Sequence, residues 1–275
     1  MSLKINRYLF NNFGDISPGL FSRYGLHLWG KTHRRPWKPW ESRILQSANR
    51  RHVELHNERV AVYHWGQGDR RILMLPGWNS RASHFKNHIE QFDCLGYQVI
   101  SLDPVGHGNS TGTSTNIAQY LDTIRLIGDI YGNFDAVLGH SFGGLCIPYA
   151  LNHYHIARKA VLLATPNNLH WLFERFIKIV NAPPGVREKM RQSVEVLLGE
   201  NCWQIYSVNE QAKDLQHVPA MILHDDHDSG VPVSQAHDNH QSWPGSRLHI
   251  THHLGHQRVL RHPSATKPVI EFIRN

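Results

Sequence analysis

The sequence predicts an α/β fold in which a mostly parallel central sheet is flanked by helices and carries a small helical insertion. Short apolar runs of strand length alternate with segments of helical periodicity from about residue 70 to the end of the sequence. The runs are nearly continuous rather than alternating, which is typical of parallel strands covered by helices on both faces. The alternation pauses once, over residues 167–217, where two helical segments follow each other with no strand between them. We therefore expect residues 167–217 to form a helical cap inserted between two strands.

We expect residues 1–51 to form a basic N-terminal arm with a helix that packs on the core. Apolar side chains recur in this segment at helical spacing, and Pro18 stands near its start. The run RRPWKPW then ends any helix and is typical of an extended linker. The alternative is an arm that faces a partner or a membrane surface. The apolar side chains at helical spacing are Leu20, Phe21, Tyr24, Leu28 and Trp29.

Residues 52–275 carry the α/β pattern. The segment HVELHNERVAVYHWG alternates between apolar and polar residues and predicts a β-hairpin that closes through Gly66–Gly68. Helices are expected over residues 82–94, 116–131 and 264–274, and over SFGGLCIPYALNHY. Further strands are expected at RILMLPG, YQVISLD, FDAVLGHS, KAVLLATP, PAMILHD and SRLHITH.

Charge and composition exclude several classes of protein. The net charge is +7, but residues 1–50 hold nine basic and two acidic side chains, so the rest of the chain is electrically balanced. A nucleic-acid binder would carry its basic face on the folded body, so we expect no nucleic-acid partner. The three cysteines are scattered and form no CxxC pair, and no apolar run approaches the 18 to 20 residues of a membrane span. Together with the lack of an N-terminal signal-like run, this favours a cytoplasmic protein without a membrane span.

The motif Gly139-His140-Ser141-Phe142-Gly143 fits the pattern G-x-S-x-G. A predicted strand runs into it and a predicted helix leaves it, so Ser141 would sit on a sharp turn that needs small neighbours. The start of the helix offers the free N–H of Phe142 and a favourable dipole to a developing oxyanion. This context predicts a nucleophilic serine.

Five ordered motifs over residues 53–275 resemble those of the α/β-hydrolase superfamily, in its serine esterase and lipase-like branch with a small helical cap. They are LMLPGW, DPVGHGNS, GHSFGG, ILHDDHDSGVP and LGHQRVLRHP. The resemblance implies an α/β-hydrolase domain over residues 52–275, with the cap at about 167–217. It also implies a catalytic triad in the chain order Ser, Asp, His.

Chemistry and the resemblance together select the triad. Ser141 needs a base within hydrogen-bond reach, and His256 follows a strand and a glycine at the carboxyl edge of the sheet. The competing bases His249, His252 and His253 lie on or just after that strand. For the orienting acid, the resemblance selects Asp228, with Asp226 as the main rival and Asp225 as a further candidate.

Other residues receive supporting roles. The resemblance implies that the backbone N–H of Trp78 is the second oxyanion donor, beside that of Phe142. Asp103 is expected to cap backbone N–H groups of a glycine-rich turn. The ligand types in residues 224–228 match no standard zinc signature, so we expect no metal and no cofactor. Candidate substrate-binding residues are Trp78, His140, Trp171 and Phe176.

The expected reaction is cleavage of a small carboxylic ester through an acyl-enzyme. The same triad also serves thioesterases, carbon–carbon bond hydrolases, acyltransferases and cofactor-free haloperoxidases, and a non-catalytic binding protein could retain the scaffold. A separate anionic partner for the basic arm is a further hypothesis.

Overall fold

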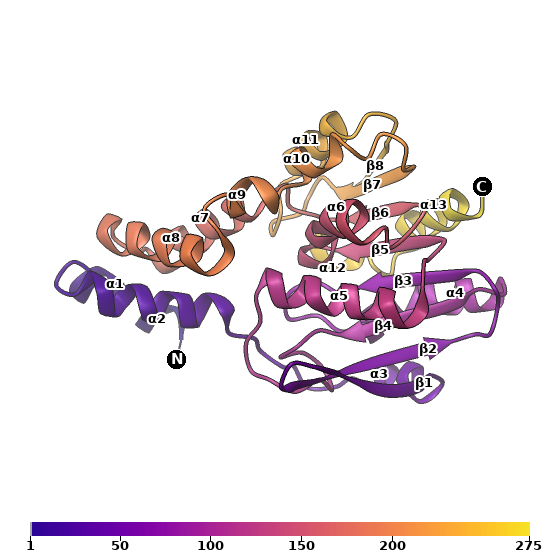
Figure 1. Cartoon of the computed structure of the whole chain (residues 1–275), viewed down its shortest axis with the longest axis horizontal. Coiled ribbons are helices and arrows are strands. Elements are labelled where there is room, and N and C mark those ends of the chain that lie inside the picture. Colours follow the sequence, from indigo (N-terminus) through magenta and orange to yellow (C-terminus); the bar gives the residue numbers. More distant parts are fainter. Residues whose placement is uncertain (1) are drawn as a thin grey trace.

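The computed structural model describes residues 2–275 and contains one eight-stranded sheet (Figure 1). The strand order is β1-β2-β4-β3-β5-β6-β7-β8, and every pair from β4 to β8 is parallel. The predicted mostly parallel sheet is therefore confirmed. The strands are β1 (Asn49–Leu55), β2 (Glu58–Trp65), β3 (Arg71–Leu75), β4 (Gln98–Asp103), β5 (Ala136–His140), β6 (Ala160–Leu163), β7 (Ala220–Asp225) and β8 (Arg247–Thr251).

Helices cover both faces of the sheet. Side chains of successive strand residues point to opposite faces, so each strand contributes to both apolar layers. Leu73 packs in the apolar layer with α5 and α6, whereas its neighbour Ile72 packs in the layer with α4 and α13. No described helix is both long and apolar enough to cross a membrane. The helices that pack on the sheet are α3 (Pro39–Gln46), α4 (Lys86–Cys94), α5 (Ile117–Tyr131), α6 (Phe142–Tyr154), α10 (Val208–Ala212), α11 (Ser234–Ser242) and α13 (Pro263–Arg274). Two short helices, η1 (Ala82–Phe85) and α12 (Gly255–Arg258), follow β3 and β8.

The predicted hairpin exists, but its turn is not at Gly66–Gly68. The chain reverses at His56 and Asn57, and β1 pairs antiparallel with β2 across this turn. His56 adopts the left-handed conformation, with φ of 51°, so the turn uses a residue other than glycine. Strand β2 then pairs antiparallel with β4, and residues 66–68 only connect β2 to β3.

Two pairs of helices form a lobe that projects from the sheet (Figure 1). Helices α7 (Leu169–Val180) and α8 (Pro184–Leu198) belong to the segment between β6 and β7, together with the short α9 (Cys202–Ile205) and α10. Helices α1 (Leu3–Phe13) and α2 (Pro18–Gly30) pack against α7 and α8. We call α1, α2, α7 and α8 the helical lobe, and the sheet with the helices that cover it the sheet body.

The lobe has its own apolar core, and this changes the expected packing of the N-terminal arm. We expected these helices to pack on the core of the domain. Most apolar side chains of α1 and α2 instead pack on the cap helices. Among these side chains, Trp29 also contacts the main core. Gly25 allows the closest approach, because a Cβ there would lie 2.5 Å from Met190 Sδ. The buried members of this lobe cluster are Phe10, Phe173, Ile177, Val180, Val186 and Met190.

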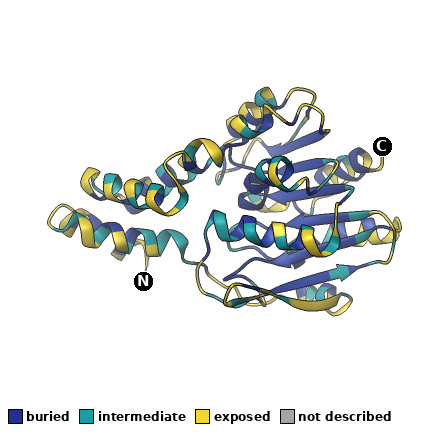
Figure 2. Ribbon diagram, in the orientation of Figure 1, coloured by how far each residue is buried: buried dark blue, intermediate teal, exposed yellow. Residues whose placement is uncertain are grey.

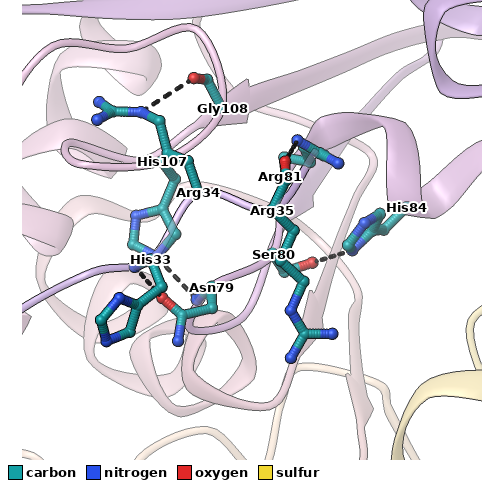
Figure 3. A pocket seen from close by; sticks show the side chains of 9 residues that line it. All are labelled: His33, Arg34, Arg35, Asn79, Ser80, Arg81, His84, His107 and Gly108. Carbon is teal, nitrogen blue, oxygen red and sulfur yellow. Dashed lines mark hydrogen bonds between the residues drawn. The ribbon is translucent and has the colours of Figure 1, made fainter. Parts of the chain in front are cut away.

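The linker after α2 is bound to the sheet body. Arg34 donates hydrogen bonds to the carbonyl oxygens of Gly108 and Ser110, at 3.2 and 2.6 Å. The buried carboxylate of Glu41 forms a bidentate pair with Arg81, with contacts of 2.8 and 2.9 Å. Arg34, a cation of the linker, is thus bonded to the sheet body (Figure 3).

Candidate active site

The nucleophile candidate lies on a strained turn between β5 and α6. Ser141 has φ of 53° and ψ of −118°, a conformation that a residue with a side chain adopts only at a cost. The turn is packed so closely that glycine is required beside it. A Cβ on Gly139 would lie 2.6 Å from Gly144 Cα, and one on Gly143 would lie 2.3 Å from the Leu75 carbonyl oxygen. The chain therefore accepts backbone strain in order to present Ser141 at the carboxyl edge of the sheet.

The loop after β3 lies against this turn. A Cβ on Gly77 would lie 3.0 Å from Ser141 Cβ, so the loop and the serine are in contact. The next residue, Trp78, stacks edge-on with Phe142, with ring centroids 5.1 Å apart. Within the described residues, neither the Trp78 nor the Phe142 backbone N–H has a hydrogen-bond acceptor. Two unsatisfied donors thus come from the two segments that flank Ser141.

Two side chains of the body fix the conformation of that loop. The Tyr120 hydroxyl donates to the Pro76 carbonyl oxygen at 2.6 Å. The Asn79 N–H donates to His107 Nε2 at 2.9 Å, and His107 Nδ1 bonds to the Val105 carbonyl oxygen. Figure 3 shows His107 and Asn79 joined in this way. Burial lowers the pKa of His107, which keeps Nε2 unprotonated and able to accept.

The structure brings Asp228 and His256 together. His256 Nδ1 donates to Asp228 Oδ2 at 2.7 Å, and Asp228 Oδ1 accepts the N–H groups of Gly230 and Val231. Burial raises the pKa of Asp228, but hydrogen bonds from His224 and His256 outweigh it and hold the pKa below its usual range. The carboxylate is therefore ionised and can only accept, so His256 Nδ1 carries the proton of this hydrogen bond.

The other two acids of this loop serve different purposes. Asp225 Oδ1 accepts the N–H of Gly255 at 2.8 Å and Oδ2 accepts that of Leu254 at 3.0 Å, which ties the His256 loop to the end of β7. Asp226 lies at the surface and pairs with His227 and His252. His252 is thereby bonded to Asp226 rather than to Asp228.

Two buried histidines, His224 and His140, have supporting roles in the site that the sequence did not predict. His224 Nε2 donates to the Val231 carbonyl oxygen at 2.8 Å and lies 3.3 Å from Asp228 Oδ2, so it shares the carboxylate with His256. His140 was expected to contact substrate, but it is 1% exposed and its Nε2 donates to the His256 carbonyl oxygen at 2.9 Å. Burial and the neighbouring His256 lower the pKa of His140 to about 3, so its ring is neutral. Its place just before Ser141 was the one available signal.

His140 is the residue that links Ser141 to His256, because it precedes Ser141 in the chain and its ring lies against that of His256. The rings of His140 and His256 lie 4.7 Å apart, and Ser141 is the next residue along the chain. In the part of the chain that the structure describes, no hydrogen bond joins Ser141 Oγ to the imidazole of His256. Such bonds are often long in the absence of substrate and shorten in the reacting complex.

The remaining predicted residues lie in several environments. Trp78 is half-buried between Phe142 and His107 at the site. Trp171 lies on α7 under the guanidinium of Arg175, and Phe176 packs against Trp29 in the lobe cluster. Phe176 is thus used in the contact between the cap and the N-terminal helices.

Asp103 is the last residue of β4, just before the glycine-rich turn, and is fully buried. Its carboxylate accepts the N–H of Asn109 at 2.8 Å, the N–H of Ala82 at 2.9 Å and the hydroxyl of Tyr63 at 2.8 Å. Burial raises the pKa of Asp103 despite these bonds. Gly108 must be glycine, because a Cβ there would lie 2.0 Å from Asp103 Oδ2.

Comparison with known proteins places this site in a family. The model of the α/β-hydrolase fold family matches residues 70–207, which include the loop after β3, the Ser141 turn and helices α7 to α9. The chain is 25% identical over 244 residues to "Serine hydrolase BPHL" of Mus musculus, covering 80% of this chain and 82% of that protein. It is 31% identical over 115 residues to a "Serine hydrolase-like protein" of Homo sapiens, covering 39% of this chain and 56% of that protein.

Solved structures share the fold at low sequence identity. A bacterial membrane phospholipase A has a TM-score of 0.62 at 15% identity, covering 94% of this chain and 93% of that chain. An enol-lactonase from Burkholderia xenovorans has a TM-score of 0.61 at 17% identity, covering 82% of this chain and all of that chain. Since the family model spans half of the sequence and the whole stretch that shapes the Ser141 turn, this chain belongs to the α/β-hydrolase fold family.

Proposed function

We propose that this serine hydrolase of the α/β-hydrolase fold cleaves carboxylic esters by two-step acyl transfer to water. The observation that carries the proposal is the Asp228–His256 hydrogen bond of 2.7 Å beside the strained Ser141 turn. Two unsatisfied N–H groups flank the same serine. A base, its orienting acid, a nucleophile and an oxyanion site are the parts that this chemistry needs.

The first step is attack on the ester carbonyl. His256 Nε2 takes the Ser141 proton as Oγ bonds to the carbonyl carbon, and the ionised Asp228 stabilises the imidazolium that forms. The negative charge on the former carbonyl oxygen is met by the N–H groups of Trp78 and Phe142. His256 then gives its proton to the leaving alcohol as the carbon–oxygen bond breaks.

The second step returns the enzyme to its starting state. His256 removes a proton from water, and the hydroxide attacks the acyl carbon in the same oxyanion site. The acid is released and Ser141 regains its proton from His256. The chain's own groups supply every proton transfer in this sequence.

The names of similar proteins define the substrates to be compared. Among the solved structures, one is the N-acyl homoserine lactone degrading Est816, at 16% identity, and another is a thioesterase domain, at 13% identity. Open-chain esters and lactones release an alcohol oxygen from the acyl carbon and thioesters release a thiol, while the attack on the acyl carbon is the same, so one triad can act on each.

The test combines a covalent probe with substrate panels. A fluorophosphonate probe should label the full chain, and the Ser141→Ala variant should lose both the label and turnover of nitrophenyl esters, by about 10⁴-fold or more. Ser193→Ala, which changes a serine on α8, is the matched control and should leave both unchanged. Turnover retained by Ser141→Ala would refute the mechanism. Thioesters hydrolysed much faster than every ester and lactone would refute the ester assignment alone.

A further inference from the structure

Exposed apolar side chains are concentrated on the N-terminal helices of the lobe. Six of the thirteen large apolar side chains that are exposed in the described chain lie within the first 20 residues. The most exposed of these are Ile16, at 76%, and Leu20, at 64%. Phe13 at the end of α1 and Ile179 at the end of α7 are exposed as well. We call Phe13, Ile16, Leu20 and Ile179 the tip.

The four tip residues lie in or beside two turns that meet. The α1–α2 turn contacts the α7–α8 turn, because a Cβ on Gly14 would lie 2.6 Å from Pro183 Cγ. Asn181 Nδ2 donates to Asn11 Oδ1 at 2.6 Å, and Arg7 Nε donates to the Ile179 carbonyl oxygen at 2.8 Å. In Figure 1 both turns lie at the end of the lobe that is farthest from the sheet. Figure 2 shows exposed residues along this outer end.

The cations around the tip have no acidic partner. Arg7, Arg23 and Lys178 are exposed, and no ion pair in the described chain joins any of them to a carboxylate. The acids of α7 and α8 are instead neutralised by arginines of α8. Glu174 pairs with Arg187, and both Glu188 and Glu195 pair with Arg191.

We propose that the tip docks on the surface of an anionic phospholipid bilayer. Apolar side chains on short helices, bordered by Lys and Arg, are the pattern of segments that lie in the boundary between headgroups and acyl chains. The unpaired cations would face the lipid phosphates, which attract basic groups within a Debye length of the surface. A second copy of the chain would instead bring three cations and one exposed carboxylate, Asp15, against the same set, which is a net repulsion. Charge complementarity therefore favours the anionic bilayer as the occupant.

The test measures vesicle binding by the full chain. Vesicles of phosphatidylcholine with an equal share of phosphatidylglycerol are compared with vesicles of phosphatidylcholine alone, by sedimentation at low and high salt. We expect binding to the anionic vesicles at least tenfold tighter than to the neutral ones, and weakened by salt. The double variant Ile16→Glu with Leu20→Glu should lose at least tenfold in binding to the anionic vesicles.

Two control variants separate loss of the tip from the effect of added charge and from loss of the proposed ester chemistry. Val196→Glu with Leu197→Glu adds the same charge at two exposed apolar positions near the opposite end of α8, and should bind as the unmodified chain does. Ser141→Ala should also bind normally, so a failure of the ester mechanism would leave this proposal standing. Equal melting temperatures show that each variant is folded.

Three results would overturn the proposal. One is absence of binding to anionic vesicles by the unmodified chain. Another is an equal loss of binding in the Val196 and Leu197 control. The third is a dimer in sedimentation velocity that the Ile16 and Leu20 variant dissociates, without vesicle binding, which would make the tip an interface between copies.

Discussion

The sheet body and the helical lobe differ in how their charged and apolar side chains are partnered. In the body, the charged groups near the site are bonded to defined partners, as Glu41 is to Arg81 and Asp228 is to His256. In the lobe, Arg23 and Lys178 have no acidic partner among the described residues, and Ile16 and Leu20 are left in water. The body thus holds individual atoms in place, whereas the lobe presents a surface.

The two regions also differ in what holds them together. The body is joined by a continuous sheet, from β1 to β8, with apolar layers on both faces. The lobe depends on one apolar cluster between helices that lie far apart in the sequence. We therefore expect a substitution in one region to have a limited effect on the stability of the other. Of the three predictions below, two concern the body and one compares the lobe with the sheet.

The largest effect is expected from Asp228→Asn. An amide at this position no longer fixes the proton on His256 Nδ1 or stabilises the imidazolium, so kcat for nitrophenyl esters should fall by about 10⁴-fold. Asp226→Asn, two residues earlier, changes a surface acid that bonds to His227, His252 and the His253 N–H, and should alter kcat by less than about tenfold. Similar losses in the two variants would contradict the assignment of the orienting acid.

A smaller effect, on the lobe alone, is expected from Phe10→Ala. Phe10 is fully buried at the centre of the lobe cluster, and removal of its ring should cost about 3–5 kcal/mol of local stability. Hydrogen exchange of α1, α2, α7 and α8 should accelerate, while β3 to β7 keep their protection. Phe13→Ala, on the same helix but exposed, is the control and should change little. Faster exchange throughout the sheet would show that the two regions unfold together.

The smallest expected effect is a pH dependence of the free energy of unfolding, which arises from buried histidines of the body. Burial lowers the pKa of His88 to about 4 and that of His140 to about 3, whereas an unfolded histidine titrates near pH 6.5. Between about pH 6.5 and 4 the unfolded state therefore binds more protons, and the free energy of unfolding should fall as the pH falls. Each such histidine contributes up to about 1.4 kcal/mol per pH unit. Urea unfolding of His88→Leu across this range should show a shallower decrease, and an unchanged slope would contradict the account.

The parallel part of the fold could be predicted because its strands are buried on both faces. In β5 and β7 every residue is buried, so the sequence shows continuous apolar runs that end in the residues of the site. The hairpin turn was misplaced because glycines at 66–68 gave a stronger local signal than His56, whose left-handed conformation depends on its neighbours.

The supporting parts of the site could not be read from the sequence. His224 reaches Asp228 because the chain folds back after β7, and nothing in the order of residues distinguishes it from its neighbours. Likewise, the periodicity of α2 shows an apolar face but not which surface covers it, and the cap rather than the sheet takes that role. Contacts between distant segments decide both cases.

The pairing of α1 and α2 with α7 and α8 has a consequence for synthesis. Residues 31–168 must be made between the two halves of the lobe, and at about 5–20 residues per second this takes on the order of ten seconds. During that time Phe10 and Phe21 lack the surface that later covers them. Helices α1 and α2 thus leave the ribosome well before their native partner is made, and until then their apolar face is open to chaperones and to wrong contacts.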